Sequence, residues 1–168
     1  MVLTILVFQM QVLPKLYPKE YSEYVEKYAK EYEIDPLWIY SIVKAESNYK
    51  INAKSKSNAI GLMQIMLSTA KEIGSEINFE EDITEEKLYE PETNIQIGTA
   101  YYKILLEKYN NINLALIAYN AGMGNLDKWL EQGIIDPQGE NLENIPYAET
   151  KNYVKKILQN YKVYSEIY

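Results

Sequence analysis

Glu46 is the residue of this sequence whose type and position best suit acid–base chemistry. It follows residues 36–45, which are almost entirely apolar and contain Lys44 as their only charge. Asp35 can cap the first free N–H groups of a helix here, and Pro36 suits the first helical position. A helix that is apolar on nearly every side is usually buried. The sequence therefore predicts a buried helix that ends in a carboxyl group.

The predicted position of Glu46 disfavours its charge. Burial raises the pKa of a carboxyl group, and the negative end of the helix dipole acts in the same direction. A glutamic acid in such a setting stays protonated near neutral pH and can donate a proton. The alternative is that Glu46 marks the solvated end of the helix. Residues spaced by three put Glu46 on one helix face with Leu37, Tyr40 and Val43.

Three further polar clusters interrupt apolar helical patterns. They are Ser55 and Ser57 with Gly61–Gln64, then Tyr119–Gly122, and Glu149–Tyr153. Each has a structural explanation when taken alone. Gln64 can be a satisfied amide at a helix start, Asn120 can shape a helix C-terminus, and Tyr153 can belong to the core.

The composition excludes several chemistries. The 168 residues include no Cys and no His, which rules out disulfides, Ser-His-Asp and Cys-His catalysis, and His-ligated metal sites. Acid–base work must fall to carboxylates, Tyr or Lys, and we expect no metal and no cofactor. The net charge of −7, without a basic block, argues against nucleic-acid binding. The 17 Tyr can offer flat faces to a sugar groove or reflect a biased composition.

The elements that must position these residues are helices. Apolar residues recur at three- and four-residue spacing, and Pro, Asn and Gly mark the boundaries. The expected helices are 21–33, 35–47, 60–73 (stopped by Gly74), 91–109, 113–119, 125–131 and 147–164. Six or seven helices without a convincing strand pair predict a compact, single all-α domain.

The first residues form a separate segment. Residues 1–13 are apolar and uncharged, too short for a membrane span of about 20 residues, and lack the basic start and cleavage site of a signal peptide. They fit a trimmed anchor, a degenerate export signal, or an element packed on the domain. We interpret them as a remnant of an export or anchoring segment, through which the chain could attach to a membrane. The expected division is 1–18 for this segment with its linker and 19–168 for the catalytic domain.

Together the clusters match one pattern, in order and approximate spacing. The sequence resembles the catalytic domain of the soluble-type lytic transglycosylases, a lysozyme-like family that cleaves peptidoglycan, from about Tyr28 to Tyr164. The matching motifs are Glu46-Ser47, Gly61-Leu62-Met63-Gln64, Ala118-Tyr119-Asn120-Ala121-Gly122 and Glu149-Thr150-Lys151-Asn152-Tyr153-Val154. Four ordered motifs are specific, whereas any one of them alone would be weak.

The resemblance implies a lysozyme-like fold with a glycan-binding groove and Glu46 as the single catalytic acid and base. It implies non-hydrolytic cleavage of the MurNAc-β-1,4-GlcNAc bond of peptidoglycan glycan strands, with a 1,6-anhydro-MurNAc product. It further implies an extracytoplasmic, cell-envelope or secreted, monomeric protein. The residues that it implies for substrate binding are Ser55, Ser57, Gln64, Met63, Met66, Tyr119, Asn120 and Tyr153.

Two other function classes stay open at this point. The first is a goose-type, lysozyme-like muramidase, a hydrolase that needs a carboxylate to activate water. Candidates lie in the acidic run Glu80–Asp82, although a charge run is usually a solvated face. The second is a non-catalytic glycan-binding or scaffolding module, whose expected signature is loss of the acid at Glu46.

Overall fold

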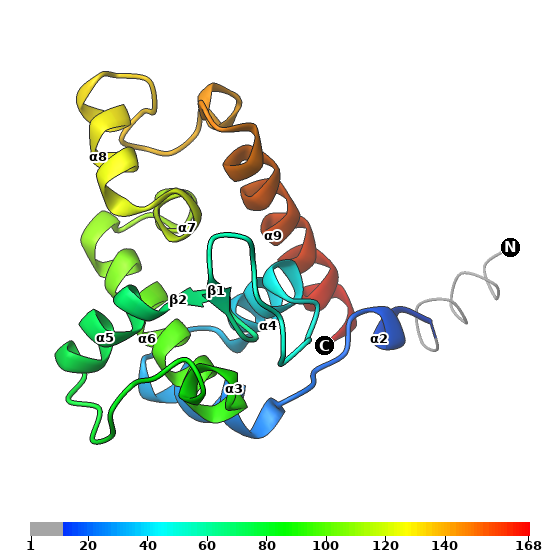
Figure 1. Ribbon diagram of the computed structural model, residues 1–168. Helices are drawn as coiled ribbons and strands as arrows, with labels where there is room; N and C mark the ends of the chain where they lie inside the picture. Colours follow the sequence, from blue (N-terminus) through cyan, green and yellow to red (C-terminus); the bar gives the residue numbers. More distant parts are fainter. Residues whose placement is uncertain (1–11) are drawn as a thin grey trace, which may run out of the picture.

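A computed structural model describes residues 12–168 of the chain (Figure 1). The interpretation of residues 1–11 as an export or anchor remnant lies outside this part. No helix within 12–168 is long and apolar enough to cross a membrane. The described α-helices are α2 (Leu13–Leu16), α3 (Ser22–Glu31), α4 (Pro36–Glu46), α5 (Leu67–Glu76), α6 (Pro91–Tyr109), α7 (Ile112–Ala121), α8 (Met123–Glu131) and α9 (Ala148–Ile167). The all-α prediction is confirmed.

Helix α4 has the boundaries and the burial that its sequence predicts. The Asp35 carboxylate accepts a hydrogen bond from the Leu37 N–H at 2.9 Å, and Pro36 occupies the first helical position. Ile39 and Ile42 are fully buried. The helix ends at Glu46, so the carboxyl group lies at the edge of the core, where it is partly buried.

Helices α4 and α9 lie side by side and run in opposite directions (Figure 1). At one end the Trp38 and Tyr161 rings stack with centroids 3.8 Å apart. Further along, the side-chain amide of Asn160 donates to the Ser41 carbonyl at 3.2 Å. This arrangement brings the first half of α9 beside Glu46.

The motif Gly61–Gln64 lies in a turn between two short strands, so the predicted helix start at residue 60 is wrong. Strands β1 (Ala59–Ile60) and β2 (Ile65–Met66) pair antiparallel. Gly61 at φ +77° and Gln64 at φ +50° adopt left-handed conformations that a helix does not allow. Helix α5 therefore starts only at Leu67.

Helix α5 also continues past Gly74, which was predicted to stop it. Gly74 is buried, and a Cβ at this position would lie 2.2 Å from the Ile83 side chain. The glycine is therefore explained by close packing against the connection to α6 and not by a helix end.

A buried amide fixes the strand pair on α6. Asn94 is fully buried; its side-chain oxygen accepts from the Met63 N–H at 2.8 Å, and its NH₂ donates to the carbonyls of Ile60 and Leu88 at 2.9 and 2.8 Å. All of its hydrogen-bonding groups are used, as a buried polar side chain requires. The turn is therefore held by the first half of α6.

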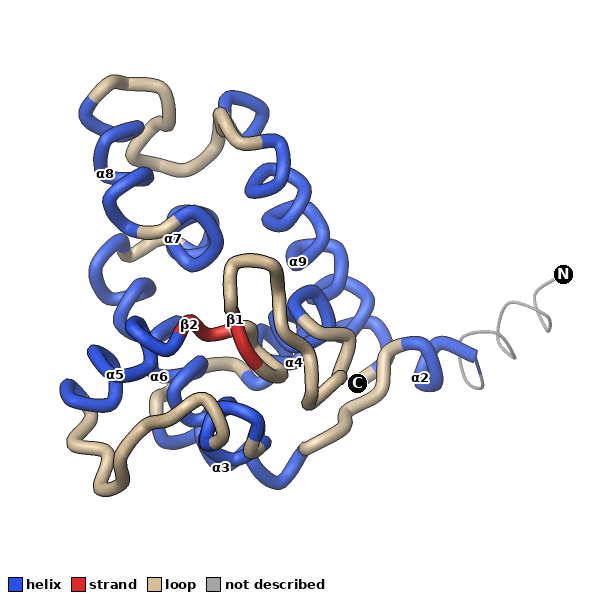
Figure 2. The backbone as a smooth tube through the Cα atoms, viewed as in Figure 1, coloured by secondary structure: helices blue, strands red, loops and turns tan. Residues whose placement is uncertain are grey.

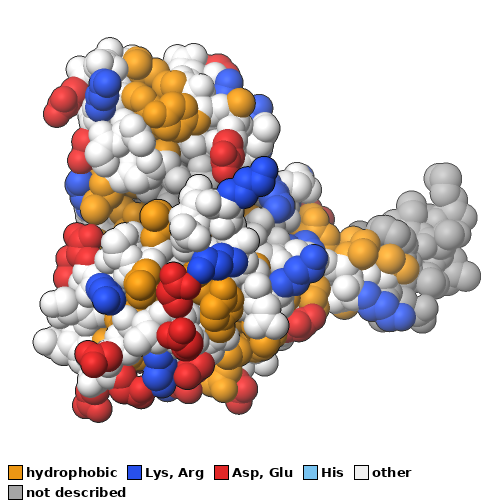
Figure 3. Space-filling view, in the orientation of Figure 1, with side chains coloured by type: hydrophobic (Ala, Val, Ile, Leu, Met, Phe, Trp, Pro, Cys, Tyr) orange, Lys and Arg blue, Asp and Glu red, His pale blue; other side chains and the backbone are white. Residues whose placement is uncertain are grey.

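The helices surround the strand pair from several sides. Figure 2 shows the connection from α4 to β1 as a long loop beside the strands. In Figure 1, α7, α8 and the start of α9 form the upper part of the molecule, and α3, α5 and α6 form the lower part. Acidic side chains gather along the lower edge of the face in Figure 3. The end of α4 lies where the two parts meet.

Candidate active site

Among the carboxyl groups of residues 12–168, that of Glu46 has a strongly raised pKa. Burial raises its pKa from 4.5 to about 7, and the negative charge of Glu149 acts in the same direction. The nearby Tyr153 hydroxyl and the Lys156 ammonium oppose this rise. The side chain is only partly buried, so the carboxyl sits in an apolar setting that a ligand can still reach. The solvated alternative for Glu46 does not fit this environment.

One face of α9 provides the neighbours of Glu46. Glu149, Tyr153 and Lys156 are spaced by four and three residues, which aligns them on one side of a helix. Lys156 also donates to the carbonyl of Ala45 at 2.6 Å, in the last turn of α4. Lys156 was not singled out in the sequence: its spacing of three residues from Tyr153 places both on one helix face, but it does not show what that face meets.

The Tyr153 hydroxyl is poised beside the carboxyl. Tyr153 is 8% exposed, and its buried hydroxyl forms no hydrogen bond of accepted geometry with another described residue. It is nevertheless close enough to Glu46 to lower the pKa of that group. An unsatisfied buried hydroxyl costs free energy, so this group is ready for a partner that completes the site.

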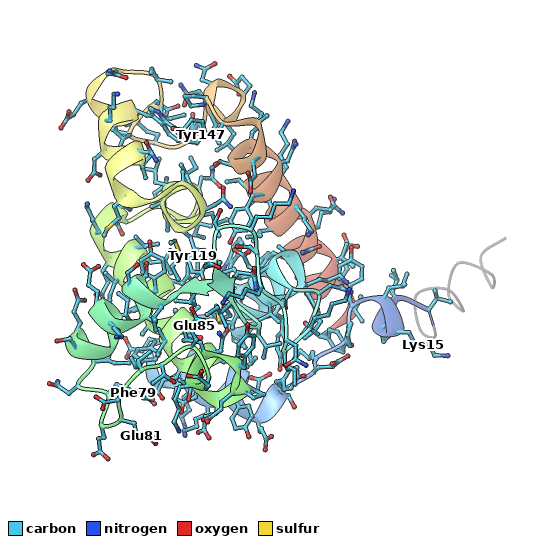
Figure 4. All side chains as sticks on the ribbon, in the orientation of Figure 1. Lys15, Phe79, Glu81, Glu85, Tyr119 and Tyr147 are labelled. Carbon is cyan, nitrogen blue, oxygen red and sulfur yellow. The ribbon has the colours of Figure 1, made fainter. Side chains whose placement is uncertain are left out.

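Tyr119 reaches the site from α7, between that helix and the strands (Figure 4). Its hydroxyl donates to the Met63 carbonyl at 3.0 Å, and its ring packs against Tyr101 with centroids 5.1 Å apart. Burial raises its pKa well above the ordinary value, and the charge of Glu46 adds to this. The Tyr119 hydroxyl already uses its hydrogen in the bond to the Met63 carbonyl, so in this structure Tyr119 holds the turn beside Glu46.

Two of the predicted sugar-binding residues, Ser55 and Gln64, use their side chains to shape the loop and the turn. The Ser55 hydroxyl accepts from the Ser57 N–H at 3.2 Å and from the Ala59 N–H at 3.0 Å. The Gln64 NH₂ donates to the carbonyls of Ala53 and Gly61 at 3.2 and 2.9 Å. Ser57 itself is exposed. The local fold thus uses the NH₂ of Gln64 and leaves its side-chain oxygen without a bond to the described residues.

The two methionines differ in exposure. Met63 is fully buried, and a Cβ on Gly98 would lie 2.5 Å from its sulfur. The prediction that Met63 gives an apolar wall to an open groove is therefore corrected: its side chain belongs to the core, because the turn directs it onto α6. Met66 is 46% exposed and can still provide such a wall.

Asn120 lies at the end of α7, next to a glycine turn. It is partly buried, and its side-chain amide bonds to no other residue of 12–168. Gly122 follows with φ +84° and separates α7 from α8. The free amide makes Asn120 available to a ligand.

The acidic run Glu80–Asp82 does not join the site. It is exposed on the connection between α5 and α6, where Glu81 forms an ion pair with Lys87 at 2.6 Å. Figure 4 shows Glu81 at the lower tip of the molecule, far from Tyr119. The second carboxylate near Glu46 is Glu149 instead. A hollow of about 700 Å³ beside Trp38 also lies elsewhere and is not lined by Glu46.

Comparisons with known proteins agree with this site. A family model described as "Transglycosylase SLT domain" matches residues 23–135. The soluble lytic murein transglycosylase of Salmonella typhimurium is 36% identical over 149 residues, which cover 87% of this chain and 23% of that protein. The membrane-bound lytic murein transglycosylase C of Actinobacillus pleuropneumoniae is 32% identical over 170 residues, covering 89% and 47%.

Solved structures show the same fold. The 70 kDa soluble lytic transglycosylase of Escherichia coli superimposes with a TM-score of 0.83 at 31% identity, over 92% of this chain and 25% of that chain. An inactive glutamate-to-glutamine mutant of the Pseudomonas aeruginosa lytic transglycosylase Slt superimposes with a TM-score of 0.82 at 30% identity, over 95% and 26%. This chain thus spans about a quarter of the length of the soluble relatives and about half of the membrane-bound one.

Proposed function

The chain belongs to the transglycosylase SLT domain family, and from this premise we propose that it is a peptidoglycan lytic transglycosylase. It cleaves the MurNAc-β-1,4-GlcNAc bond of glycan strands without water and leaves a 1,6-anhydro-MurNAc end. The observation that carries the proposal is the partly buried carboxyl of Glu46 at the end of α4, beside the unpartnered Tyr153 hydroxyl, in a setting that raises its pKa to about 7. Such a group is protonated in part of the population and ionised in the rest, as a residue that acts first as acid and then as base requires.

In the first step Glu46 acts as the general acid. Its carboxyl donates a proton to the oxygen that joins the two sugars, and the bond from this oxygen to C1 of the muramic sugar breaks. Positive charge then develops at C1, as in other glycosidic cleavages. The 2-acetamido group of the same sugar stabilises this charge, so the protein does not need a second carboxylate as nucleophile.

In the second step the Glu46 carboxylate acts as the base. It accepts the proton of the C6 hydroxyl, whose oxygen attacks C1 and closes the anhydro ring. The carboxyl group is thereby returned to its starting form. The rise of the pKa through burial serves the first step, and the opposing effects of Tyr153 and Lys156 keep the group ionisable for the second.

The surrounding residues bind the sugars. We place the glycan strand of the substrate across the end of α4. The loop before β1, the end of α7 and the first half of α9 meet there. The Tyr153 hydroxyl and the Asn120 amide have unused donors for the acetamido group. The other proposed contacts with the sugars come from the accessible side-chain atoms of Ser55, Ser57, Gln64, Met66 and Tyr119.

A hydrolase of goose-lysozyme type is the second candidate, and the specific observation in its favour is Glu149. This exposed carboxylate is near enough to raise the pKa of Glu46 and can in principle activate a water molecule. Product mass separates the two reactions. A transglycosylase adds no water per cut, whereas a hydrolase adds one, so a digest that contains only reducing-end muropeptides refutes the proposal.

The substitution Glu46→Gln tests the role of the acid. It keeps the size of the side chain and removes its proton, and we expect the release of anhydro products from purified peptidoglycan to fall at least about a hundredfold. Glu149→Gln is the matched control, because it removes a carboxylate from the same site, and it should keep anhydro products as the only products. Unchanged lysis by the Glu46 variant contradicts the assignment and favours a binding module.

The same proposal sets the location and the partner. Peptidoglycan lies outside the cytoplasm, so the proposed activity places the protein in the cell envelope or outside the cell after secretion. We propose separately that it works there as a monomer. Residues 1–18 are proposed as the segment that attaches it to a membrane, and residues 19–168 as the catalytic domain. Fractionation of cells that produce the whole protein tests the attachment.

A further inference from the structure

The outer face of α9 carries a line of lysines. Lys151, Lys155 and Lys162 follow one another at spacings of four and seven residues, which places them on one side of the helix. Lys155 and Lys162 are exposed, and Lys151 is partly exposed. With a rise of about 1.5 Å per residue, this basic stripe is about 16 Å long. It lies on a different side of α9 from Tyr153, which faces Glu46.

The charge of the basic stripe is not compensated. None of its three lysines forms an ion pair with an acidic group of residues 12–168. The carboxylates of α9 are Glu149, which acts on Glu46, and Glu166, one turn beyond Lys162. In a chain with a net charge of −7, whose acidic side chains gather along the lower edge in Figure 3, the stripe is a local positive surface that attracts anions.

Helix α2 packs beside the end of α9 that carries Lys162, and both lie on the right flank of the molecule in Figure 1. The ring of Tyr17, directly after α2, meets the Tyr164 ring edge to face with centroids 5.4 Å apart, and the Tyr168 hydroxyl donates to the Tyr17 carbonyl at 3.1 Å. Two apolar side chains stay exposed here: Leu16 at 53% and Val12 at 37%. Exposed apolar groups therefore lie next to the basic stripe.

The chain before α2 adds apolar residues to the same flank. Residues 1–11 contain no charged side chain, and Lys15 on α2 is exposed. An apolar segment too short to span a bilayer binds it weakly, and stable attachment takes a second signal such as a basic patch. Lysines close to an anionic lipid surface supply this second signal, because each of them adds to the binding.

We infer that the flank formed by α2 and the basic stripe of α9 docks on an anionic lipid surface. The inference goes beyond the proposed attachment through residues 1–18, because the folded domain itself supplies the charge that selects the lipid and orients the molecule. Since Tyr153 lies on another side of α9, the docked protein keeps the site at Glu46 uncovered. The docking does not depend on which reaction the site catalyses.

The test is sedimentation of the full chain with two kinds of vesicle: phosphatidylcholine alone, and phosphatidylcholine mixed with an equal amount of phosphatidylglycerol. The ratio of the two partition coefficients is measured for the wild type and for the combined variant Lys151→Gln, Lys155→Gln and Lys162→Gln. We expect this variant to lower the ratio at least about tenfold at low ionic strength. The wild-type ratio itself should fall as salt is added, because salt screens the attraction.

Two matched variants control for charge and for position. Arginine at the same three positions keeps the charge and should keep the ratio. Glutamine at Lys30, Lys71 and Lys128 removes three exposed lysines of α3, α5 and α8, which also form no ion pair within residues 12–168. This variant should keep the ratio as well. Equal thermal midpoints show that all the variants are folded.

The two kinds of vesicle also separate the proposals. Binding to phosphatidylcholine alone reports the attachment through residues 1–18 and should be the same in every variant. The difference between the vesicles reports the basic stripe. If the wild type releases no anhydro product from peptidoglycan, the proposed function fails, and the ratio of partition coefficients still decides this inference.

Any one of four results overturns the inference. The first is a wild-type ratio close to one at low salt, and the second is an unchanged ratio in the glutamine variant of the stripe. The third is an equal fall in the variant of α3, α5 and α8, which means that net charge and not the flank governs binding. The fourth is a stripe variant that keeps its vesicle ratio but loses binding to a soluble polyphosphate, because the partner is then an anionic polymer and not a membrane.

Discussion

The Glu46 carboxyl sets the pH range in which we expect activity. The first step needs this group protonated, and its pKa lies at about 7. The rate of anhydro-product release should therefore fall as the pH rises above about 7, because the acid form disappears. Rates on purified peptidoglycan measured from about pH 5 to pH 9 check this. A flat profile over that range contradicts general-acid catalysis by Glu46.

The same pKa makes Glu46 a cost to stability at neutral pH. The folded pKa lies above the unfolded value of 4.5, so between the two values the folded protein holds a proton that the unfolded chain has released. Stability therefore falls as the pH rises from about 4.5 to 7. We expect Glu46→Gln to raise the free energy of unfolding by about 2–3 kcal/mol at pH 8.

Denaturant unfolding of the wild type and of Glu46→Gln at two pH values measures this effect. Near pH 4 the wild-type group is protonated in both states, and the gain from the substitution should almost disappear. Glu149→Gln provides the control for loss of an exposed carboxylate in the same site. A gain that is equal at both pH values means that the substitution acts through packing and not through charge.

For single residues, the sequence predicts a role in the site where that role follows from the residue type and its position in a helix. Glu46 could be singled out because capping by Asp35 and an apolar run predict where the buried helix ends. Burial of Met63 could not be foreseen, because it depends on a turn that sends its side chain onto α6. Lys156 was missed for a related reason. A lysine on a helix is expected to face solvent, and only the fold shows that this one contacts α4.

At the scale of elements, the strand pair is the piece that the sequence did not reveal. Its strands have two residues each, too few for a periodic pattern, and the turn between them contains no Pro or Asn. The turn is held by contacts with distant parts of the chain: Asn94 bonds to Ile60 and Met63, and the Gln64 side chain bonds to the Ala53 carbonyl. Helices α4, α6 and α9 were predicted because their signals are local: the Asp35 cap of α4, Pro at the first positions of α4 and α6, and the apolar periodicity of α6 and α9.

Asn94→Ala tests the dependence of the turn on α6. The substitution leaves the N–H of Met63 and the carbonyls of Ile60 and Leu88 buried without their partner. We expect a loss of about 3 kcal/mol in the free energy of unfolding. Because the Met63 carbonyl holds Tyr119, activity should fall more than the folded fraction does. Denaturant melts and rates at a temperature where the variant is folded separate the two effects.

Asn144→Ala, in an exposed position of the connection before α9, is the control for the loss of an asparagine. It should change stability by less than about 0.5 kcal/mol. If Asn94→Ala costs no more than this control, the turn is held by something other than the amide, and the account of the strand pair given above is wrong.

At the scale of the whole molecule, α9 joins the two ends of the described chain. Tyr164 is fully buried near its C-terminus. Its hydroxyl donates to the Pro18 carbonyl at 2.9 Å and also contacts the Tyr49 hydroxyl. Its ring meets that of Tyr40, on α4, with centroids 5.8 Å apart. Helix α4 is therefore supported near Tyr40, away from its catalytic end, by residues from three distant parts of the sequence.

Tyr164→Ala should consequently disturb a site that it does not touch. Loss of a buried ring costs about 4 kcal/mol, which lowers the thermal midpoint by roughly 10 °C in a chain of this size. Helix α9 carries Tyr153 and Lys156, so its loosening also moves the groups that affect the pKa of Glu46. We therefore expect activity to be lost at temperatures well below the thermal midpoint of the variant. Tyr168→Ala removes a tyrosine that is 52% exposed in the same region and should change both quantities little. Melting curves and rates measured together decide the matter: if activity persists up to the lowered midpoint, α9 acts as a passive support and the positions of Tyr153 and Lys156 are not sensitive to its packing.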